Sequence, residues 1–187
     1  MSIPNLITLG RVILVPVVFW LLLSGQMQAA FFVFVVAGIS DGVDGYLAKR
    51  FDWTTELGAY LDPLADKLLL VCIFIALGVA GHLPSWLVIA VVSRDVLIVM
   101  GVILAWVLNN PVVIHPLVVS KANTVAQILL AALVMADEGF ALDLSGPRMA
   151  MVWLTAALVV TSLAAYIRAW LSHMSSDDAA RTGQPLD

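Results

Sequence analysis

The sequence predicts an all-α integral membrane protein, a bundle of six transmembrane helices that occupies residues 1–173. Of its 187 residues, 62% are hydrophobic and only 12% are charged, and the mean hydropathy is +1.03. Soluble domains carry about 25% charged residues, so this composition indicates a membrane protein. Six runs are long enough to cross a bilayer, which takes about 20 mostly apolar residues. The breaks between the runs are short and contain Gly, Pro and Asn, so successive helices should be antiparallel neighbours.

The first helix is predicted over residues 6–24. Arg11 interrupts its apolar stretch and five further runs follow, which argues against a cleaved signal peptide. Nothing before residue 6 resembles an Arg-rich and Ser-rich mitochondrial leader. We therefore expect a multi-pass protein of a bacterial inner (cytoplasmic) membrane.

The second and third helices are predicted over residues 28–48 and 58–80, and they carry an unusual number of carboxylates. Four of these lie at helical spacings: Asp41, Asp44, Asp62 and Asp66. The first two are three apart and the last two are four apart, so each pair projects from one face of its helix. The connecting loop is short enough to set the helices side by side. We expect the four carboxylates to converge in a pocket just below the membrane surface.

Carboxylates inside a membrane span should be paired or bound to metal, because an isolated charge in hydrocarbon is costly. Lys49 and Lys67 are too few to neutralise four acids. Hard divalent cations such as Mg²⁺ and Mn²⁺ prefer carboxylate oxygens and also bridge to phosphates. Gly42, Gly45 and Gly58 lie beside the acids and would let a nucleotide or diphosphate approach the backbone closely.

A purely structural role is the alternative for these acids, which would then cap helix ends and pair with neighbouring cations. This interpretation suits Asp52 and Glu56, because charges in a connecting loop are usually solvated. It suits the four acids at helical spacing poorly, because solvated caps need not lie within spans.

The last three helices are predicted over residues 84–108, 117–136 and 149–171, and a disordered tail is predicted over 174–187. Basic residues set the orientation. On the side of the N-terminus we expect Lys49, Arg50, Lys121, Arg168 and Arg181, and on the other side only Arg148. The positive-inside rule therefore places the N-terminus and the acidic pocket on the cytoplasmic side.

The stretch from Asp41 to Lys49, continued by three further residues, resembles the signature D-x2-D-G-x2-A-R-x8-G-x3-D-x3-D of the CDP-alcohol phosphotransferases. The continuation is formed by Gly58, Asp62 and Asp66. Every fixed position agrees at the correct spacing except Lys49, where the signature usually has Arg. Lysine keeps the charge but loses the bidentate fork, so Lys49 or the neighbouring Arg50 could take the part of that arginine.

The resemblance implies a six-helix membrane enzyme, commonly a homodimer, with a cytoplasm-facing site for two divalent cations, Mg or Mn. It assigns the metals and the diphosphate of a CDP-linked lipid to Asp41, Asp44, Asp62 and Asp66. It assigns the CDP moiety to Asp44, Gly45, Ala48, Lys49 and Gly58. It also implies that Asp66 is the catalytic base, which takes the proton from the attacking hydroxyl.

Other stretches resemble one branch of this family. "IPNLITLGRVILVPV" and "LDPLADKLLL" resemble the branch that contains phosphatidylglycerophosphate synthases and CMP-forming cardiolipin synthases. "SRDVLIV" and "VSKANTVAQILL" favour the cardiolipin synthases, which transfer phosphatidyl from CDP-diacylglycerol to phosphatidylglycerol. The other group typically has Lys at the place of Asn123. Its acceptor, glycerol phosphate, is a dianionic monoester, whereas phosphatidylglycerol is a monoanionic diester that needs one fewer cation.

The phosphate of the acceptor is expected to lie against Arg94, Lys121 and Asn123, with Arg11 as a weaker contributor that could instead snorkel to the interface. Asp95 would orient one of these basic side chains. A buried helix-to-helix ion pair between Arg94 and Asp95 is the structural alternative.

Three other function classes remain as alternatives or are excluded. Intramembrane prenyltransferases also hold Mg²⁺-diphosphate on Asp-rich helices but lack the Gly-x3-Asp-x3-Asp continuation. An ion-coupled transporter with membrane-buried carboxylates is a more remote alternative. Nucleic acid is not expected as a partner, because the net charge is −4 and the pI is near 5.1.

Cys72 is the only cysteine, which excludes disulfides within the chain and zinc sites built from several thiolates.

Overall fold

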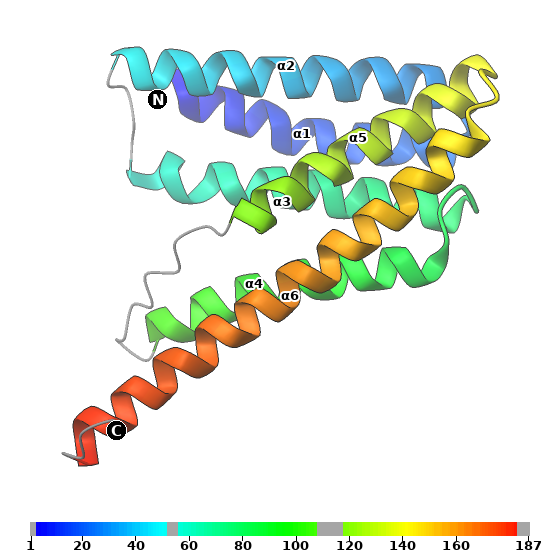
Figure 1. The fold of residues 1–187 in the computed structure, drawn as a ribbon. Helices are drawn as coiled ribbons and strands as arrows, with labels where there is room; N and C mark the ends of the chain where they lie inside the picture. The colour runs from blue at the N-terminus through cyan, green and yellow to red at the C-terminus, as the bar shows by residue number, and fades with distance from the viewer. Residues whose placement is uncertain (1–2, 52–55, 108–117, 183–187) are drawn as a thin grey trace.

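The computed structural model describes residues 3–51, 56–107 and 118–182, and these residues form six helices (Figure 1). Side chains are described at residues 10, 13–40, 42, 67–100 and 119–168. The helices are α1 (Ile3–Leu23), α2 (Met27–Phe51), α3 (Glu56–Val79), α4 (Ser85–Val107), α5 (Val118–Phe140) and α6 (Ser145–Thr182). The predicted all-helical class is confirmed.

Among the residues whose side chains are described, two stretches are long and apolar enough to cross a membrane, Val119–Phe140 in α5 and Ser145–Arg168 in α6. Shorter apolar stretches are Ile13–Leu23, Met27–Ser40 and Lys67–Val79. The bundle of six complete spans therefore stays a prediction.

Successive helices run in opposite directions, as the short connections predicted (Figure 1). The turns after α1, α3 and α5 lie at one end of the molecule, which we call the turn end. Gly25 and Gly81 make the first two turns possible, because they have φ values of +72° and +81°. In each turn the next residue closes a Schellman motif: Gln26 N donates to Leu21 O and His82 N donates to Leu77 O, both at 2.9 Å.

The part of the hydrophobic core whose side chains are described lies toward the turn end. α1 packs against α2 and α3, α5 packs against α2 and α6, and α4 packs against α3 and α6. Fully buried side chains come from the halves of these helices next to the turns, including Leu22, Phe74, Leu87, Leu130 and Met135. The helix halves that carry the acidic signature lie at the opposite end, which we call the signature end.

Two features differ from the sequence prediction. α6 continues through Thr182, so residues 174–182 have a helical backbone where a disordered tail was expected. Extending an existing helix needs no new nucleation, and Ala179 and Ala180 favour it. The second difference concerns α2 and α3. Among the described contacts these helices do not pack against each other, whereas α1 packs against both.

Candidate functional site

The backbones of α2 and α3 place the four predicted metal ligands at matching depths. Asp41 and Asp66 each lie ten residues from the end of their helix at the 52–55 connection, which is about 15 Å along the axis at 1.5 Å per residue. Asp44 and Asp62 lie nearer to that end, at about 10 Å. The side chains of all four are outside the described set, so their convergence stays a prediction.

The donor set has the chemistry that a hard divalent cation requires, because carboxylate oxygens are its preferred ligands. Among the side chains that the structure describes there is no group of three or more His, Cys, Asp or Glu that could hold a metal. The four aspartates are not in that set. Gly42, between the first two aspartates, is exposed, and a Cβ added there would meet nothing within 4 Å. The helix surface beside it is therefore open.

Several predicted contact residues also fall outside the described side chains. These are Gly45, Ala48, Lys49 and Gly58 for the CDP moiety and Arg11 for the acceptor phosphate. Their backbones are helical, on α2, α3 and α1. Their predicted roles are untested.

A buried polar cluster surrounds Arg94 on α4, whose side chain is only 1% exposed. Its Nη1 donates to Asp95 Oδ1 at 2.5 Å, and its Nη2 donates to Ser120 Oγ at 2.6 Å and to Ser162 Oγ at 2.7 Å. Its Nε also donates to Ser162 Oγ at 3.2 Å. The guanidinium carbon lies 6.0 Å from the centre of the Tyr166 ring. Arg94 therefore links α4 to α5 and α6.

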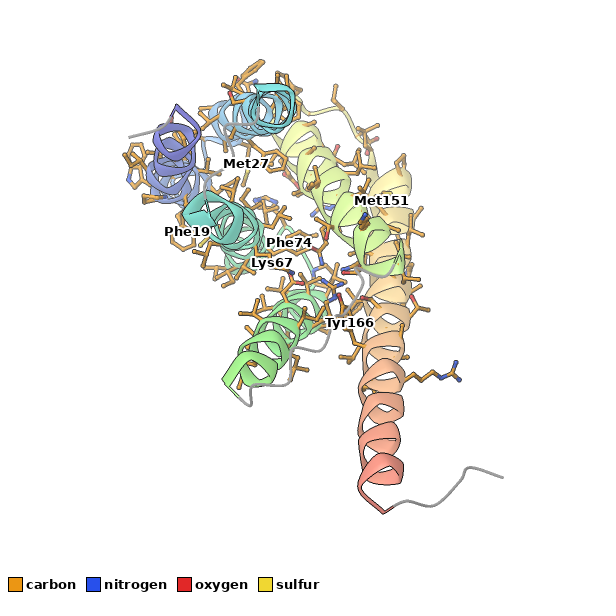
Figure 2. The ribbon with its side chains drawn as sticks, turned by 90° about the vertical axis from the view of Figure 1, so that its left-hand side faces the viewer. Phe19, Met27, Lys67, Phe74, Met151 and Tyr166 are labelled. Atoms are coloured by element: carbon orange, nitrogen blue, oxygen red, sulfur yellow. The ribbon has the colours of Figure 1, made fainter. Side chains whose placement is uncertain are left out.

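Asp95 extends this cluster to α3. Its Oδ1 accepts a second bond, at 3.2 Å, from Nζ of Lys67, the residue that follows the predicted base Asp66. Figure 2 shows Lys67 and Tyr166 on two sides of the region where nitrogen and oxygen atoms gather between the helices. Asp95 neutralises one of the two cations, so Lys67, Arg94 and Asp95 together carry a net charge of +1.

The structure separates the residues predicted to hold the acceptor phosphate. Asp95 orients Arg94 as expected, but the hydrogen bonds of Arg94 go to protein groups on α4, α5 and α6, which is the buried-pair alternative. Lys121 is exposed on α5, and no described contact joins it to Arg94. Asn123 is fully buried, and neither of its side-chain atoms has a described hydrogen-bond partner.

Sequence analysis missed five polar residues of this region, namely Lys67 as the partner of Asp95, and Ser120, Gln127, Ser162 and Tyr166. Helical spacing offered a signal for four of them. Ser120, Asn123 and Gln127 recur on α5 at steps of three and four, and Ser162 and Tyr166 are four apart on α6.

A sequence model described as CDP-alcohol phosphatidyltransferase matches residues 1–174 of the chain. A chloroplastic CDP-diacylglycerol–glycerol-3-phosphate 3-phosphatidyltransferase of rice is 34% identical over 89% of this chain and 56% of its own length. Human CMP-forming cardiolipin synthase is 31% identical over 74% of this chain and 52% of its own length. A Pseudomonas fluorescens CDP-diacylglycerol–glycerol-3-phosphate 3-phosphatidyltransferase is 32% identical over 95% of this chain and 94% of its own length. The chain thus spans about half the length of the first two relatives and nearly all of the third.

Proposed function

Because this chain belongs to the CDP-alcohol phosphatidyltransferase family, we propose that it transfers phosphatidyl from CDP-diacylglycerol to a hydroxyl of phosphatidylglycerol, giving cardiolipin and CMP. The observation that carries this proposal is the family signature on α2 and α3, where Asp41, Asp44, Asp62 and Asp66 occupy matched depths. Membership of the family supports the donor and the reaction type. The choice of acceptor rests on the arguments below.

The reaction exchanges one phosphoester bond for another. The hydroxyl oxygen of the acceptor bonds to the phosphorus that carries diacylglycerol, and the bond from that phosphorus to the CMP oxygen breaks. Asp66 accepts the hydroxyl proton, which a carboxylate can do when it lies within hydrogen-bond reach of that hydroxyl. Two divalent cations, Mg or Mn, would be held by the four aspartates and would neutralise charge on the diphosphate. Gly45, Ala48, Lys49 and Gly58 would lie against the CDP moiety.

The net charge of the cluster formed by Lys67, Arg94 and Asp95 supports an acceptor with a single negative charge. Arg94 is compensated by Asp95, so the described polar cluster retains only one net positive charge, with Lys67 at its rim. A phosphodiester such as phosphatidylglycerol carries one negative charge and needs less positive charge to neutralise it than a dianionic monoester does.

A second candidate is phosphatidylglycerophosphate synthase, with glycerol 3-phosphate as the acceptor. It is favoured by similarity over nearly the full length to bacterial proteins named CDP-diacylglycerol–glycerol-3-phosphate 3-phosphatidyltransferase. One is from P. fluorescens, and another, 31% identical over 90% of this chain and 94% of its own length, is from Escherichia coli K12. This alternative uses the same donor, the same carboxylates and the same leaving group.

Separate assays with each acceptor distinguish the two candidates. Purified protein in detergent would receive CDP-diacylglycerol labelled in its phosphatidyl group, Mg²⁺ or Mn²⁺, and either phosphatidylglycerol or glycerol 3-phosphate. We expect labelled cardiolipin and stoichiometric CMP from the first mixture. Product from glycerol 3-phosphate alone would assign the second function. The absence of CMP release with both acceptors would contradict the transferase activity itself and would leave an ion-coupled transporter as the alternative.

We further propose that the enzyme is a homodimer of the bacterial inner membrane with its active site facing the cytoplasm. The asymmetry of Lys and Arg between the two ends of the helices supports this orientation. Both proposed substrates are lipids, so lateral entry between helices from the cytoplasmic leaflet follows from the same placement.

A further inference from the structure

Five buried side-chain atoms on α5 and α6 have no hydrogen-bond partner among the described residues. They are Nδ2 and Oδ1 of Asn123, Nε2 and Oε1 of Gln127, and Oγ1 of Thr155. The three side chains are at most 1% exposed. Each buried polar group without a partner costs about 1–3 kcal/mol, so three such side chains in one part of a bundle are costly unless a bound group or water supplies the missing bonds.

The three side chains continue the polar cluster around Arg94. Ser120, which bonds Arg94, shares one stripe of α5 with Asn123 and Gln127, because the steps are three and four residues. On α6, Ser162 also bonds Arg94, and Thr155 lies two turns away on the same stripe.

The antiparallel arrangement brings these two stripes into register. α5 and α6 pack against each other, so the step from Ser120 to Gln127 and the step from Ser162 to Thr155 run in the same direction. A polar seam defined by Asn123, Gln127 and Thr155 therefore extends from the Arg94 cluster toward the turn end. Its near end adjoins α3 through the bond between Asp95 and Lys67.

The donor and acceptor chemistry of the seam selects its ligand. An amide side chain presents an NH₂ donor and a carbonyl acceptor. A hydroxyl can donate to the carbonyl oxygen and accept from the NH₂ group, and it can supply up to three of the missing bonds. An ionised phosphodiester only accepts, and it would leave the carbonyl oxygens of Asn123 and Gln127 unsatisfied. The seam contributes no charged side chain, which also fits a neutral group.

We propose that Asn123, Gln127 and Thr155 form a subsite for the non-reacting hydroxyl on the glycerol unit of the acceptor. Phosphatidylglycerol and glycerol 3-phosphate share this hydroxyl, so the subsite serves either acceptor. The inference rests on the proposed phosphatidyltransferase function and adds a specificity element to it. It also gives Asn123 a different role, because the residue recognises a hydroxyl and not the acceptor phosphate.

The experiment compares each natural acceptor with an analogue that lacks only this hydroxyl. Phosphatidyl-1,3-propanediol replaces phosphatidylglycerol, and 3-hydroxypropyl phosphate replaces glycerol 3-phosphate; both keep the primary hydroxyl that reacts. Wild-type protein should show a kcat/KM about tenfold or more lower for the deoxy analogue, since 1.4 kcal/mol corresponds to a factor of ten. Gln127→Leu and Thr155→Val should lose that discrimination while the KM for CDP-diacylglycerol is unchanged.

Thr161→Val is the matched control for Thr155→Val. Thr161 lies on the same helix, is exposed, and bonds only carbonyls of its own helix among its described contacts. The melting temperature of each variant in detergent is measured in parallel. It should stay constant or rise for Gln127→Leu, because an apolar side chain of similar size removes buried polar atoms.

The outcomes separate this inference from the proposed function. If wild-type protein forms product from an acceptor but uses its deoxy analogue equally well, the seam holds only water and the inference fails alone. Variants that change the kinetics of natural and deoxy acceptors by the same factor would overturn it too. If wild-type protein forms product with neither natural acceptor, the proposed function fails and the inference fails with it.

Discussion

Arg94 is the largest fully buried side chain among those that the structure describes, and its burial depends on Asp95. The carboxylate accepts from Arg94 and from Lys67, while two serine hydroxyls accept the other described bonds of the guanidinium. A buried charge without its counter-charge is strongly destabilising, whereas replacing both members of a pair by apolar side chains is often neutral. The pair therefore sets the geometry of this region more than it adds net stability.

Asp95→Asn should lower the free energy of unfolding by about 3–5 kcal/mol, because it leaves Arg94 buried without a counter-charge. The double variant Arg94→Met with Asp95→Leu should recover most of that loss. Unfolding by SDS titration in mixed micelles measures both changes. Equal destabilisation of the single and double variants would show that the loss does not arise from an uncompensated charge.

Asp66→Asn tests the proposed base directly. The amide keeps the shape of the carboxylate but cannot take the hydroxyl proton, so we expect CMP release to fall by about 10²- to 10⁴-fold. Asp143→Asn is the control, because Asp143 is exposed in the turn between α5 and α6 with a φ of +53°, which Asn tolerates. Turnover by Asp66→Asn at the wild-type rate would remove Asp66 from the catalytic step.

Sequence reasoning at this scale identified residue types better than it identified partners. The spacing of the four aspartates was readable because a helix has a fixed period. The partners of Arg94 were not, because Ser120 and Ser162 are distant in the chain and meet it only through helix packing. Lys121 was predicted as a second phosphate ligand because of its charge. It follows Ser120, which bonds Arg94, but its own side chain is exposed.

At the scale of the helices, close backbone approach fixes how α5 meets α2. A Cβ added at Gly139 would lie 3.0 Å from the backbone N of Gln28 and 3.2 Å from its Cα. Backbone atoms cannot rotate away as a side chain can, so α2 or α5 would have to shift. The missing side chain at Gly139 therefore allows α5 to approach the backbone of α2 this closely.

Gly139→Ala should destabilise the protein by about 1–3 kcal/mol, the typical cost of inserting a methyl group into a packed contact. Gly38→Ala is the matched control, because Gly38 is exposed within α2 and a Cβ there would meet nothing within 4 Å. That control should be neutral or slightly stabilising, since Ala favours the helix over Gly. SDS unfolding of the two variants provides the comparison, and equal effects would exclude a steric cause.

The helices themselves were largely predictable from the sequence, and their packing was not. Runs of apolar residues and the glycines at 25 and 81 located the elements and the first turns. The continuation of α6 to Thr182 was missed, because composition describes a tail without the helix that precedes it. The contacts of α1 with both α2 and α3 were also missed, because a short connection between two helices does not specify which other helix packs against them.

At the scale of the whole molecule, the two ends of the bundle have different chemistry. At the turn end, Arg148 donates to Glu138 Oε1 at 2.7 Å and to the backbone oxygen of His82, and Glu138 lies 3.0 Å from Nδ1 of His82. This basic residue is thus paired with an acid. The Trp86 and Trp153 rings lie 5.5 Å apart at the same end, and both residues are exposed, as aromatic residues at a membrane interface are.

The signature end carries more basic residues than the turn end, and this asymmetry predicts which turns face away from the cytoplasm. Cysteines introduced at Gln26, Ser85 and Ser145, in a Cys72→Ser background, should all react with a membrane-impermeant maleimide in right-side-out spheroplasts. A cysteine at Ser176, in the other end of α6, should react only after lysis. Because Gln26, Ser85 and Ser145 follow the first, third and fifth helices, they share one side if both helices of each intervening pair cross the membrane, and they lie on opposite sides if one helix of a pair does not cross. Labelling of Ser145→Cys without Gln26→Cys or Ser85→Cys would reduce the number of spans, and labelling of Ser176→Cys alone would invert the orientation and place the carboxylates away from cytoplasmic CDP-lipid.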